Sequence, residues 1–407
     1  MKKIKFLLLF IILIPTMVLA SDTVNFKVNG KYYESFLDAY NAASLSNPLI
    51  ILNDMDFDNT LTINKSIEIN LNNHTISAPK MVFKLEGGTL NLTGKGTVRE
   101  KNPYFGAVVI KGSKENKSDY SILNVGSEVT LEGWSGIMID HNNKKGYGIK
   151  VNFNGKINAL KDTTGDTGVG IYVNGFIKDK ENMPEINLSN TSYIKSTGPG
   201  LYLAGYSKLN YDGYTEGYES GLSIKSGIVN IKDGKIVATG PDKTPTSPNG
   251  NGTNASGAGI QIESNSSYAG DIELNIINGT VESKNGNMFY EFTSSSTTPT
   301  KVKNISIQNG TFISLKDNFK VSNSFKDNHP KFISGGKFTS DIQEYLKSGS
   351  LKNNDNYYQV VIKDIDTTKN LTIKSINLLP IIVIIIFLIT LGIYLYLKMQ
   401  KKIFTKK

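Results

Sequence analysis

The sequence predicts an all-β fold: a parallel β-helix with short capping helices, an N-terminal signal peptide and one C-terminal transmembrane helix. Three observations lead to this prediction. A glycine-containing phrase recurs at intervals of about 22 residues. Strand-like segments alternate apolar and polar residues between turn pairs. A long apolar run lies near each end of the chain. The 407 residues include no cysteine, so packing and hydrogen bonds must hold the fold without disulfides.

The N-terminus, residues 1–20, has the three parts of a secretory signal peptide. Three lysines precede the apolar run Phe6–Ile14, and the small residues Val18 and Ala20 stand at the −3 and −1 positions of a cleavage site. The alternative is an uncleaved anchor helix, but the apolar stretch is shorter than the ~20 residues that a span needs. We therefore expect the chain to be exported.

The C-terminus predicts a single membrane span at residues 378–397. This segment carries no charge, its length matches ~30 Å of bilayer hydrocarbon, and Tyr394 and Tyr396 stand where aromatic side chains favour the interface. Five lysines follow in residues 398–407, and such positive flanks stay cytoplasmic. We expect a single-pass cell-membrane protein with its ectodomain outside, residues 363–377 as a stalk, and a cytoplasmic tail. No LPxTG-type pentapeptide precedes the span, so the helix should be retained without cell-wall linkage.

Net charge says little about partners in this chain. The formal charge is +9, but the signal peptide and the tail hold most of it and leave about +1 for the ectodomain. We therefore expect a lipid membrane as a partner through the C-terminal helix, and no nucleic acid. Abundant lysine, asparagine and isoleucine without cysteine is typical of a Gram-positive bacterium with an AT-rich genome.

A phrase, Gly-(Ile/Leu)-x-(Ile/Val/Leu), recurs six times, starting at Gly136, Gly148, Gly170, Gly200, Gly221 and Gly259. The 38-residue gap before the last copy contains residues 241–257, a polar stretch that predicts a looped-out insertion. Without these residues the gap shortens to 21, close to the common period. The 12-residue gap after the first copy fits no period, so one of the first two copies must sit elsewhere on the repeat.

A second pattern joins two strands by a turn pair, as at Asp233-Gly234, Asn278-Gly279, Asn309-Gly310 and Gly335-Gly336. Such pairs also predict β-hairpins, so an antiparallel meander is the alternative. A meander does not explain a period of about 22 residues, whereas a rung of two or three short strands does. We expect about 11–13 rungs stacked over residues 46–339.

Covers are expected at both ends of the solenoid, because open ends expose unpaired strand edges. Within residues 21–45, a strand precedes an amphipathic helix with the apolar residues Tyr33, Phe36, Leu37 and Tyr40. Residues 340–362 form the other cap. There, Ser340 and Gln343 predict a capping box that starts a helix, and Tyr357–Ile362 predicts a closing strand.

Several segments resemble a known family: Gly30-Lys-Tyr-Tyr33, Asp38-Ala-Tyr-Asn-Ala-Ala43, Leu61-Thr-Ile-Asn-Lys-Ser66 and Ile69-Asn-Leu-Asn-Asn-His-Thr-Ile76. They look like the opening of right-handed parallel β-helix (pectin-lyase-like) surface proteins of Gram-positive, often gut-dwelling, bacteria. Ile333–Leu346 is similar to the usual ending of these proteins. The resemblance covers nearly the whole ectodomain and implies a right-handed solenoid. It says little about activity, because one scaffold hosts many functions, although many members look like adhesins or glycan-binding proteins.

Catalytic motifs of the pectin-lyase-like fold are missing from the sequence. Hydrolases of this fold carry Asn-Thr-Asp, Gly-His-Gly and Arg-Ile-Lys, and none of these occurs here. Lyases combine a calcium-binding acidic cluster with a basic residue. Arg99 is the only arginine and has no acidic cluster nearby in sequence, although lysine or tyrosine can also serve as the base.

The sequence predicts no metal site and no cofactor. Three alternating aspartates, Asp54, Asp56 and Asp58, match the start of an EF-hand, but the glycine and glutamate that complete such a loop are missing. We expect Met55 and Phe57 to point inward and the aspartates to lie in water. The three histidines, at positions 74, 141 and 329, are scattered and have no zinc spacing.

The strongest binding candidate is a tyrosine-rich segment with interleaved carboxylates. Tyrosine offers a flat apolar face and a polar tip, and carboxylates accept hydrogen bonds from sugar hydroxyls. The predicted ligand-binding residues are Tyr202, Tyr206, Tyr211, Tyr214, Tyr218, Asp212 and Glu216. A row of such rings on neighbouring rungs could stack an extended glycan, and the alternative is ordinary packing along one face. Trp134, the only tryptophan, either joins this surface or fills the core.

These observations lead to a functional hypothesis: a membrane-anchored, non-enzymatic surface adhesin or glycan-binding protein, whose partner is an extracellular glycan or a host surface. An elongated scaffold, a membrane anchor and the lack of catalytic motifs support it. The alternatives are a cell-tethered calcium-dependent polysaccharide lyase and a passive surface spacer without a ligand.

Overall fold

The computed structural model describes residues 24–112, 120–141, 148–175, 183–245, 252–293, 299–354, 356–362, 388–393 and 398. The chain divides into two compact units, Met1–Ile362 and Lys363–Lys407. The predicted signal peptide, stalk and almost all of the tail lie outside the described residues, as does the predicted span except for residues 388–393, which are helical. Among the described residues, no helix has the length and apolar character needed to cross a membrane.

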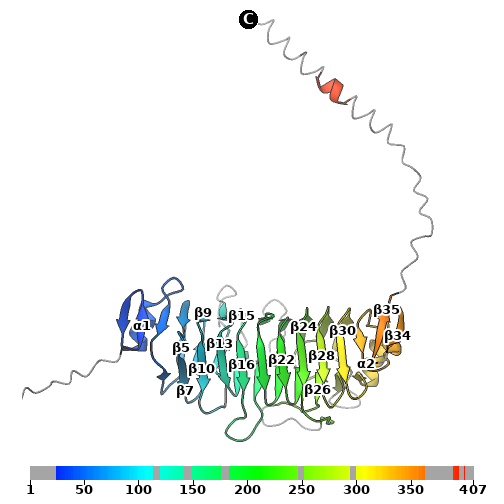
Figure 1. Ribbon diagram of the computed structural model, residues 1–407, viewed down its shortest axis with the longest axis horizontal. Coiled ribbons are helices and arrows are strands. Elements are labelled where there is room, and N and C mark those ends of the chain that lie inside the picture. The colour runs from blue at the N-terminus through cyan, green and yellow to red at the C-terminus, as the bar shows by residue number, and fades with distance from the viewer. Residues whose placement is uncertain are drawn as a thin grey trace, which may run out of the picture. The chain divides into compact units, whose positions relative to one another are not determined.

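The first unit is all-β, and its strands stack along one axis in three long sheets, named here A, B and C (Figure 1). Consecutive strands of the chain go to the three sheets in turn, and neighbours within a sheet are parallel except at the two ends. The described residues form ten complete three-strand rungs, fewer than the 11–13 expected. The predicted all-β fold with parallel sheets is confirmed, and the antiparallel meander is excluded.

Sheet A contains, in spatial order, β2 (Lys31–Tyr33), β1 (Phe26–Val28), β3 (Leu49–Ile51), β6 (Ile67–Asn70), β9 (Gly88–Thr93), β12 (Ser121–Val125), β15 (Ile149–Phe153), β18 (Glu185–Leu188), β21 (Lys208–Tyr211), β24 (Gly227–Ile231), β27 (Ile272–Ile276) and β30 (Val302–Ile307). Sheet B contains β4 (Met55–Asp56), β7 (Thr75–Ala78), β10 (Gly96–Glu100), β13 (Val129–Gly133), β16 (Lys156–Ala159), β19 (Tyr193–Ser196), β22 (Tyr214–Gly217), β25 (Lys235–Ala238), β28 (Thr280–Ser283), β31 (Thr311–Ser314), β33 (Lys337–Phe338), β35 (Tyr357–Val361) and β34 (Ser350–Asn354). Sheet C contains β5 (Leu61–Ile63), β8 (Phe83–Leu85), β11 (Val108–Lys111), β14 (Ser135–His141), β17 (Val169–Gly175), β20 (Pro199–Leu203), β23 (Ser220–Ile224), β26 (Ala258–Ser264), β29 (Phe289–Thr293) and β32 (Phe319–Lys320).

The recurring glycine phrase marks one position on the rung. Five of its six copies lie in register on five consecutive strands of sheet C, β14 to β26. The copy at Gly148 instead leads into β15 of sheet A, as the 12-residue gap required. At Gly221, a Cβ atom would lie 2.5 Å from Cγ2 of Ile236 and 2.7 Å from the carbonyl oxygen of Gly259, both in the next rung. Glycine is therefore needed where successive rungs approach most closely.

An asparagine ladder runs along the outside of sheet A, and the sequence analysis did not foresee it. From the second member onward, each side-chain amide donates to the amide oxygen of the preceding asparagine at 2.7 to 3.4 Å. The eight members are Asn91, Asn124, Asn152, Asn187, Asn210, Asn230, Asn275 and Asn304. Most of these amides are half-buried, where water reaches them poorly. The ladder therefore supplies the hydrogen-bond partners that water would otherwise provide.

Breaking the ladder in its middle should weaken the solenoid. Asn187→Leu removes the bonds to Asn152 (3.0 Å) and Asn210 (2.8 Å), and we expect the free energy of unfolding to fall by about 1 kcal/mol. Urea denaturation measures this change. Asn158→Leu on the outside of sheet B is the control, because Asn158 is exposed and makes only one long bond, 3.4 Å to Glu132, among the described residues. Equal effects of both substitutions would contradict a stabilising ladder.

The N-terminal end is covered by a helix and a hairpin. Helix α1 (Phe36–Ala42) begins after Ser35, whose Oγ accepts the backbone N–H of Asp38 at 3.5 Å, and it lies at one end of the stack (Figure 1). Phe36 packs against the core and Tyr40 is buried. Two residues of the expected apolar face do not belong to it: Leu37 is 63 % exposed, and Tyr33 is part of β2.

The C-terminal cap differs from the prediction. Ser340 does not start a helix, because its hydroxyl accepts the backbone N–H of Asn318 at 2.8 Å in the preceding rung. Gln343–Tyr345 forms only one 3₁₀ turn, η1, without a side-chain cap. A helix that was not predicted, α2 (Asn323–Asn328), is capped by the hydroxyl of Ser322 instead. Antiparallel strands β34 and β35 then close sheet B.

Candidate functional site

The predicted tyrosine row does not form, and two of its members show why. Tyr211 points into the core from sheet A, is fully buried, and donates its hydroxyl to the carbonyl oxygen of Lys235 at 2.7 Å. Tyr214 lies on the outside of sheet B, where its ring stacks on Tyr193 at 4.9 Å and its hydroxyl donates to Glu216 at 2.9 Å. Stacking therefore covers one face of each ring.

The other predicted binding residues lie in several different environments. Tyr202 and Tyr206 are buried, whereas Tyr218 is 50 % exposed and Asp212 is partly exposed in a turn. Glu216 pairs with Lys195 at 3.1 Å on the outside of sheet B. The residues are therefore divided among the core, the outside of sheet B and the outside of sheet C, and glycan binding by them stays a prediction.

An aromatic cluster covers part of the outside of sheet C. The ring of Tyr172 stacks on Tyr202 at 5.0 Å and contacts Trp134 at 5.4 Å. The Trp134 indole N–H donates to the carbonyl oxygen of Thr167 at 2.9 Å. Burial raises the pKa of Tyr172 to about 12. Trp134 thus lies neither inside the solenoid nor on an exposed surface, but in a second, smaller apolar cluster.

The C-terminal part of the predicted insertion, residues 252–257, docks beside this cluster. The Tyr202 hydroxyl donates to the carbonyl oxygen of Gly252 at 2.6 Å, and the backbone N–H of Gly257 donates to the carbonyl oxygen of Glu219 at 2.7 Å. Burial raises the pKa of the Glu219 carboxyl, against the opposing effect of hydrogen bonds from Thr167 and Thr253. The insertion is therefore not a free loop at this end but part of the packed structure.

A buried lysine lies at the centre of this region. Lys225 is 1 % exposed, and its Nζ contacts Glu263 Oε2 at 2.8 Å, the carbonyl oxygen of Gly252 at 2.9 Å and the Tyr268 hydroxyl at 2.9 Å. The ammonium also lies over the rings of Tyr202 and Tyr268, at 5.2 and 4.6 Å from their centroids. All three N–H groups of Lys225 have acceptors, so its described contacts do not leave this ammonium free for a ligand.

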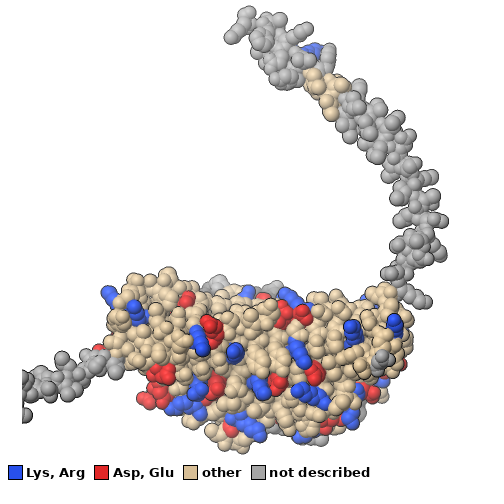
Figure 2. Space-filling view, in the orientation of Figure 1, with Lys and Arg blue, Asp and Glu red and all other residues tan. Residues whose placement is uncertain are grey.

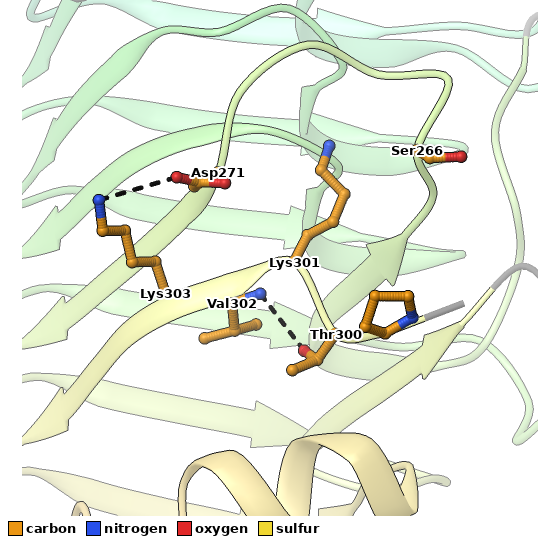
Figure 3. Close-up of a pocket in the computed structure, with 7 residues that line it drawn as sticks. Ser266, Asp271, Thr300, Lys301, Val302 and Lys303 are labelled. Carbon is orange, nitrogen blue, oxygen red and sulfur yellow. Dashed lines mark hydrogen bonds and ion pairs between the residues drawn. The ribbon is translucent and has the colours of Figure 1, made fainter. Parts of the chain in front are cut away.

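An open pocket of about 340 Å³ lies next to Lys225, and we call it the Lys301 pocket (Figure 3). Its lining residues are Ser266, Asp271, Pro299, Thr300, Lys301, Val302 and Lys303. Lys301 Nζ donates to the carbonyl oxygens of Lys225 at 3.0 Å and of Tyr268 at 2.8 Å. Among the described residues, no carboxylate lies within ion-pair distance of this ammonium.

The electrostatics of the Lys301 pocket suit an anionic group. Burial lowers the pKa of Lys301 to about 8, although the carboxylates of Asp271 and Glu263 oppose this shift. Lys303 lies beside Asp271, 3.9 Å from its carboxylate, and is largely exposed (Figure 3). The pocket thus combines two amines, one carboxylate and two hydroxyls, which are groups that recognise a carboxylated sugar.

The other candidates from the sequence have local structural partners. Asp54 and Asp56 are exposed, while Met55 and Phe57 pack against the core as expected. Arg99 pairs with Glu132 at 2.6 Å on the surface. Within the described part of the chain, no group of three or more histidine, cysteine or carboxylate side chains is placed to hold a metal ion.

A second pocket, about 570 Å³, lies near the C-terminal end and is lined by Asp242, Asn287, Leu315, Lys316, Asp317, Phe319 and Lys320. Its lysines already have partners: Lys316 lies 3.9 Å from Asp242, and Lys320 lies over the ring of Tyr290. Figure 2 shows cationic and anionic side chains interspersed over the visible face of the solenoid, so no single-sign patch dominates that face. The Lys301 pocket is therefore the better site for a ligand.

Sequence reasoning missed both lysines, although one signal was present. Lys225 and Glu263 each follow a copy of the glycine phrase directly, and the preceding residues Ile224 and Ile262 are in register. Aligning the copies would therefore have predicted a lysine beside a glutamate on adjacent rungs. No comparable signal marks Lys301. No protein-family model, no curated protein and no solved structure matches this chain.

Proposed function

We propose that this protein is a membrane-anchored, extracellular, right-handed β-helix protein that binds an acidic glycan in the Lys301 pocket. The termini support export and anchoring in the cell membrane, and the family resemblance supports the surface location and the handedness. The observation that carries the ligand class is Lys301 itself, a partly buried ammonium at an open pocket, with two neutral carbonyl acceptors and no ion-pair partner among the described residues.

A uronic acid or another carboxylated sugar fits this chemistry. Its carboxylate would be neutralised by Lys301 and approached by Lys303, while Ser266, Thr300 and Asp271 are placed to bond its hydroxyls. The solenoid itself supplies a rigid frame, because β30 pairs with β27, the strand that follows the loop after β26, and both strands contribute residues to the core. A single pocket of this size holds one or two sugar units of a polymer.

The test is binding of the purified full-length protein to polygalacturonate, with neutral dextran as the comparison. Lys301→Ala should weaken binding about 10-fold to 100-fold, because it removes a charge-assisted bond. Lys195→Ala on the outside of sheet B is the matched control and should bind normally. Binding should also decline as the pH rises through about 8, because Lys301 then loses its charge. Equal binding by wild type and Lys301→Ala would refute the site.

One observation favours the second candidate, a polysaccharide lyase. With its pKa lowered to about 8, Lys301 can be a neutral amine in mildly alkaline solution and accept the proton next to a uronate carboxylate. The absorbance of unsaturated uronate would then increase as the pH rises through about 8, opposite to the trend expected for binding. A flat absorbance trace dismisses the lyase, and the passive spacer predicts neither binding nor absorbance.

A further inference from the structure

Three buried polar side chains from different segments meet where residues 252–257 of the insertion dock on the solenoid. Lys225 follows β23, Asn254 belongs to the insertion, and Glu263 lies in β26; they are 1, 5 and 6 % exposed. Glu263 Oε2 accepts from Lys225 Nζ at 2.8 Å and from Asn254 Nδ2 at 2.8 Å. One carboxylate oxygen thus holds a primary amine and a carboxamide side by side.

The surroundings of this triad exclude water. The rings of Tyr202 and Tyr268 lie over the Lys225 ammonium, and the carbonyl oxygen of Gly252, in the docked part of the insertion, accepts a hydrogen bond from it. The amide oxygen of Asn254 is buried and has no hydrogen-bond partner among the described residues. A buried amide with an unpartnered carbonyl oxygen costs stability, so this arrangement needs a reason beyond packing.

We propose that the triad forms an intramolecular isopeptide bond between Lys225 and Asn254, with Glu263 as the proton carrier. Glu263 first takes a proton from the Lys225 ammonium, and the neutral Nζ attacks Cγ of Asn254. A bond forms between Nζ and Cγ, and the carbon becomes tetrahedral. Glu263 then delivers its proton to Nδ2, the Cγ–Nδ2 bond breaks, and ammonia leaves.

The reaction balances without any oxidant, reductant or co-reactant. Glu263 takes the second Nζ proton as the amide forms and passes it to the departing ammonia, so the products are one amide bond and one ammonium ion. Glu263 returns to its carboxylate form. The neighbouring carboxylate and the exclusion of water are the two conditions that make an amine nucleophilic at an amide carbon.

The bond would fasten the insertion to the solenoid in a chain that has no cysteine. It would join residue 225 directly to residue 254 and so fix the end of the segment that covers Tyr202. Such a bond resists reduction, unlike a disulfide, and it restricts the unfolded chain in the same way. An exported protein without disulfides gains a covalent brace by this route.

Peptide mapping by mass spectrometry of the purified, folded full-length protein tests the proposal. We expect a branched peptide that contains both Lys225 and Asn254, lighter than the sum of the two linear peptides by one ammonia, about 17 Da. Glu263→Gln should give the two linear peptides with full masses. Two linear peptides from folded wild-type protein would overturn the proposal, whatever the stability of the variants.

A neighbouring asparagine provides a matched control. Asn265 Nδ2 also donates to Glu263, but to the other oxygen, Oε1, at 3.1 Å. Asn265→Ala should therefore keep the branched peptide, whereas Asn254→Ala should lose it. A branch that maps to Asn265 would contradict the assignment to Asn254.

Discussion

Tyr211→Ala should lower the free energy of unfolding by about 3–5 kcal/mol, the range for removing a large aromatic side chain from a packed core. Tyr211 is fully buried at the end of β21 and belongs to the continuous core of the solenoid. Its hydroxyl donates to the carbonyl oxygen of Lys235 at 2.7 Å, which joins this strand to the next rung. The substitution leaves a cavity and an unpaired carbonyl, and urea denaturation measures the loss.

Two further variants separate the contributions at this position. Tyr211→Phe keeps the ring and removes only the hydroxyl, so we expect a loss of about 1 kcal/mol. Tyr214→Ala is the matched control in the same rung, because Tyr214 lies partly exposed on the outside of sheet B and should cost much less. If Tyr214→Ala destabilised the protein as much as Tyr211→Ala, the placement of Tyr211 inside the core would be wrong.

The sequence predicted the rungs well because the solenoid imposes strong local rules. Inward positions must be apolar and corners must be small. Leu222 and Ile224 therefore follow Gly221 at the same spacing as the apolar residues in the neighbouring copies of the phrase. The 12-residue gap also indicated that one copy of the phrase sits elsewhere on the rung, and the structure shows that the Gly148 copy leads into a strand of sheet A. The caps were harder to predict, because the hydroxyl of Ser340 bonds to the preceding rung instead of starting a helix.

The predicted row of tyrosines on one face does not form, because the chain turns between its members. Asp212 and Gly213 lie between β21 of sheet A and β22 of sheet B, so Tyr211 and Tyr214 belong to different sheets, one ring inside the core and the other outside. Tyr202 does point outward, but residues 252–257 cover it, and a polar insertion has no periodicity from which its path can be predicted. For the same reason, the sequence could pair Lys225 with Glu263 but could not bring Asn254 to them.

The Lys301 pocket depends on a similar non-periodic feature. It forms where the turn after β26 and the approach to β30 leave the regular rung, so neither the period nor the strand alternation marks it. Its charge pattern was also hidden, because Lys301 and Lys303 are two of many lysines in the sequence. What distinguishes Lys301 is the partial burial of its amine, which only the packing of β26, β30 and their connecting segments determines.

Gly221→Ala should destabilise the solenoid by about 1–3 kcal/mol although it adds only one methyl group. The added Cβ would lie 2.5 Å from Cγ2 of Ile236 and 2.7 Å from the carbonyl oxygen of Gly259. Neither atom can move freely, because Ile236 is buried in the core and Gly259 is part of the backbone of β26. The strain therefore falls on the parallel pairing between β23 and β26, and hydrogen exchange of the amides in these strands should accelerate.

Gly126→Ala, in the turn between β12 and β13, is the matched control for the same substitution. There a Cβ would lie 3.3 Å from the carbonyl oxygen of Leu92, and no other atom comes closer. This contact requires only a small adjustment, so the thermal midpoint of Gly126→Ala should stay close to that of wild type. If both variants behaved alike, close packing of successive rungs would not be the reason for the glycine phrase. The phrase would then reflect backbone preference at the corner, and its register across five strands of sheet C would need a different physical cause.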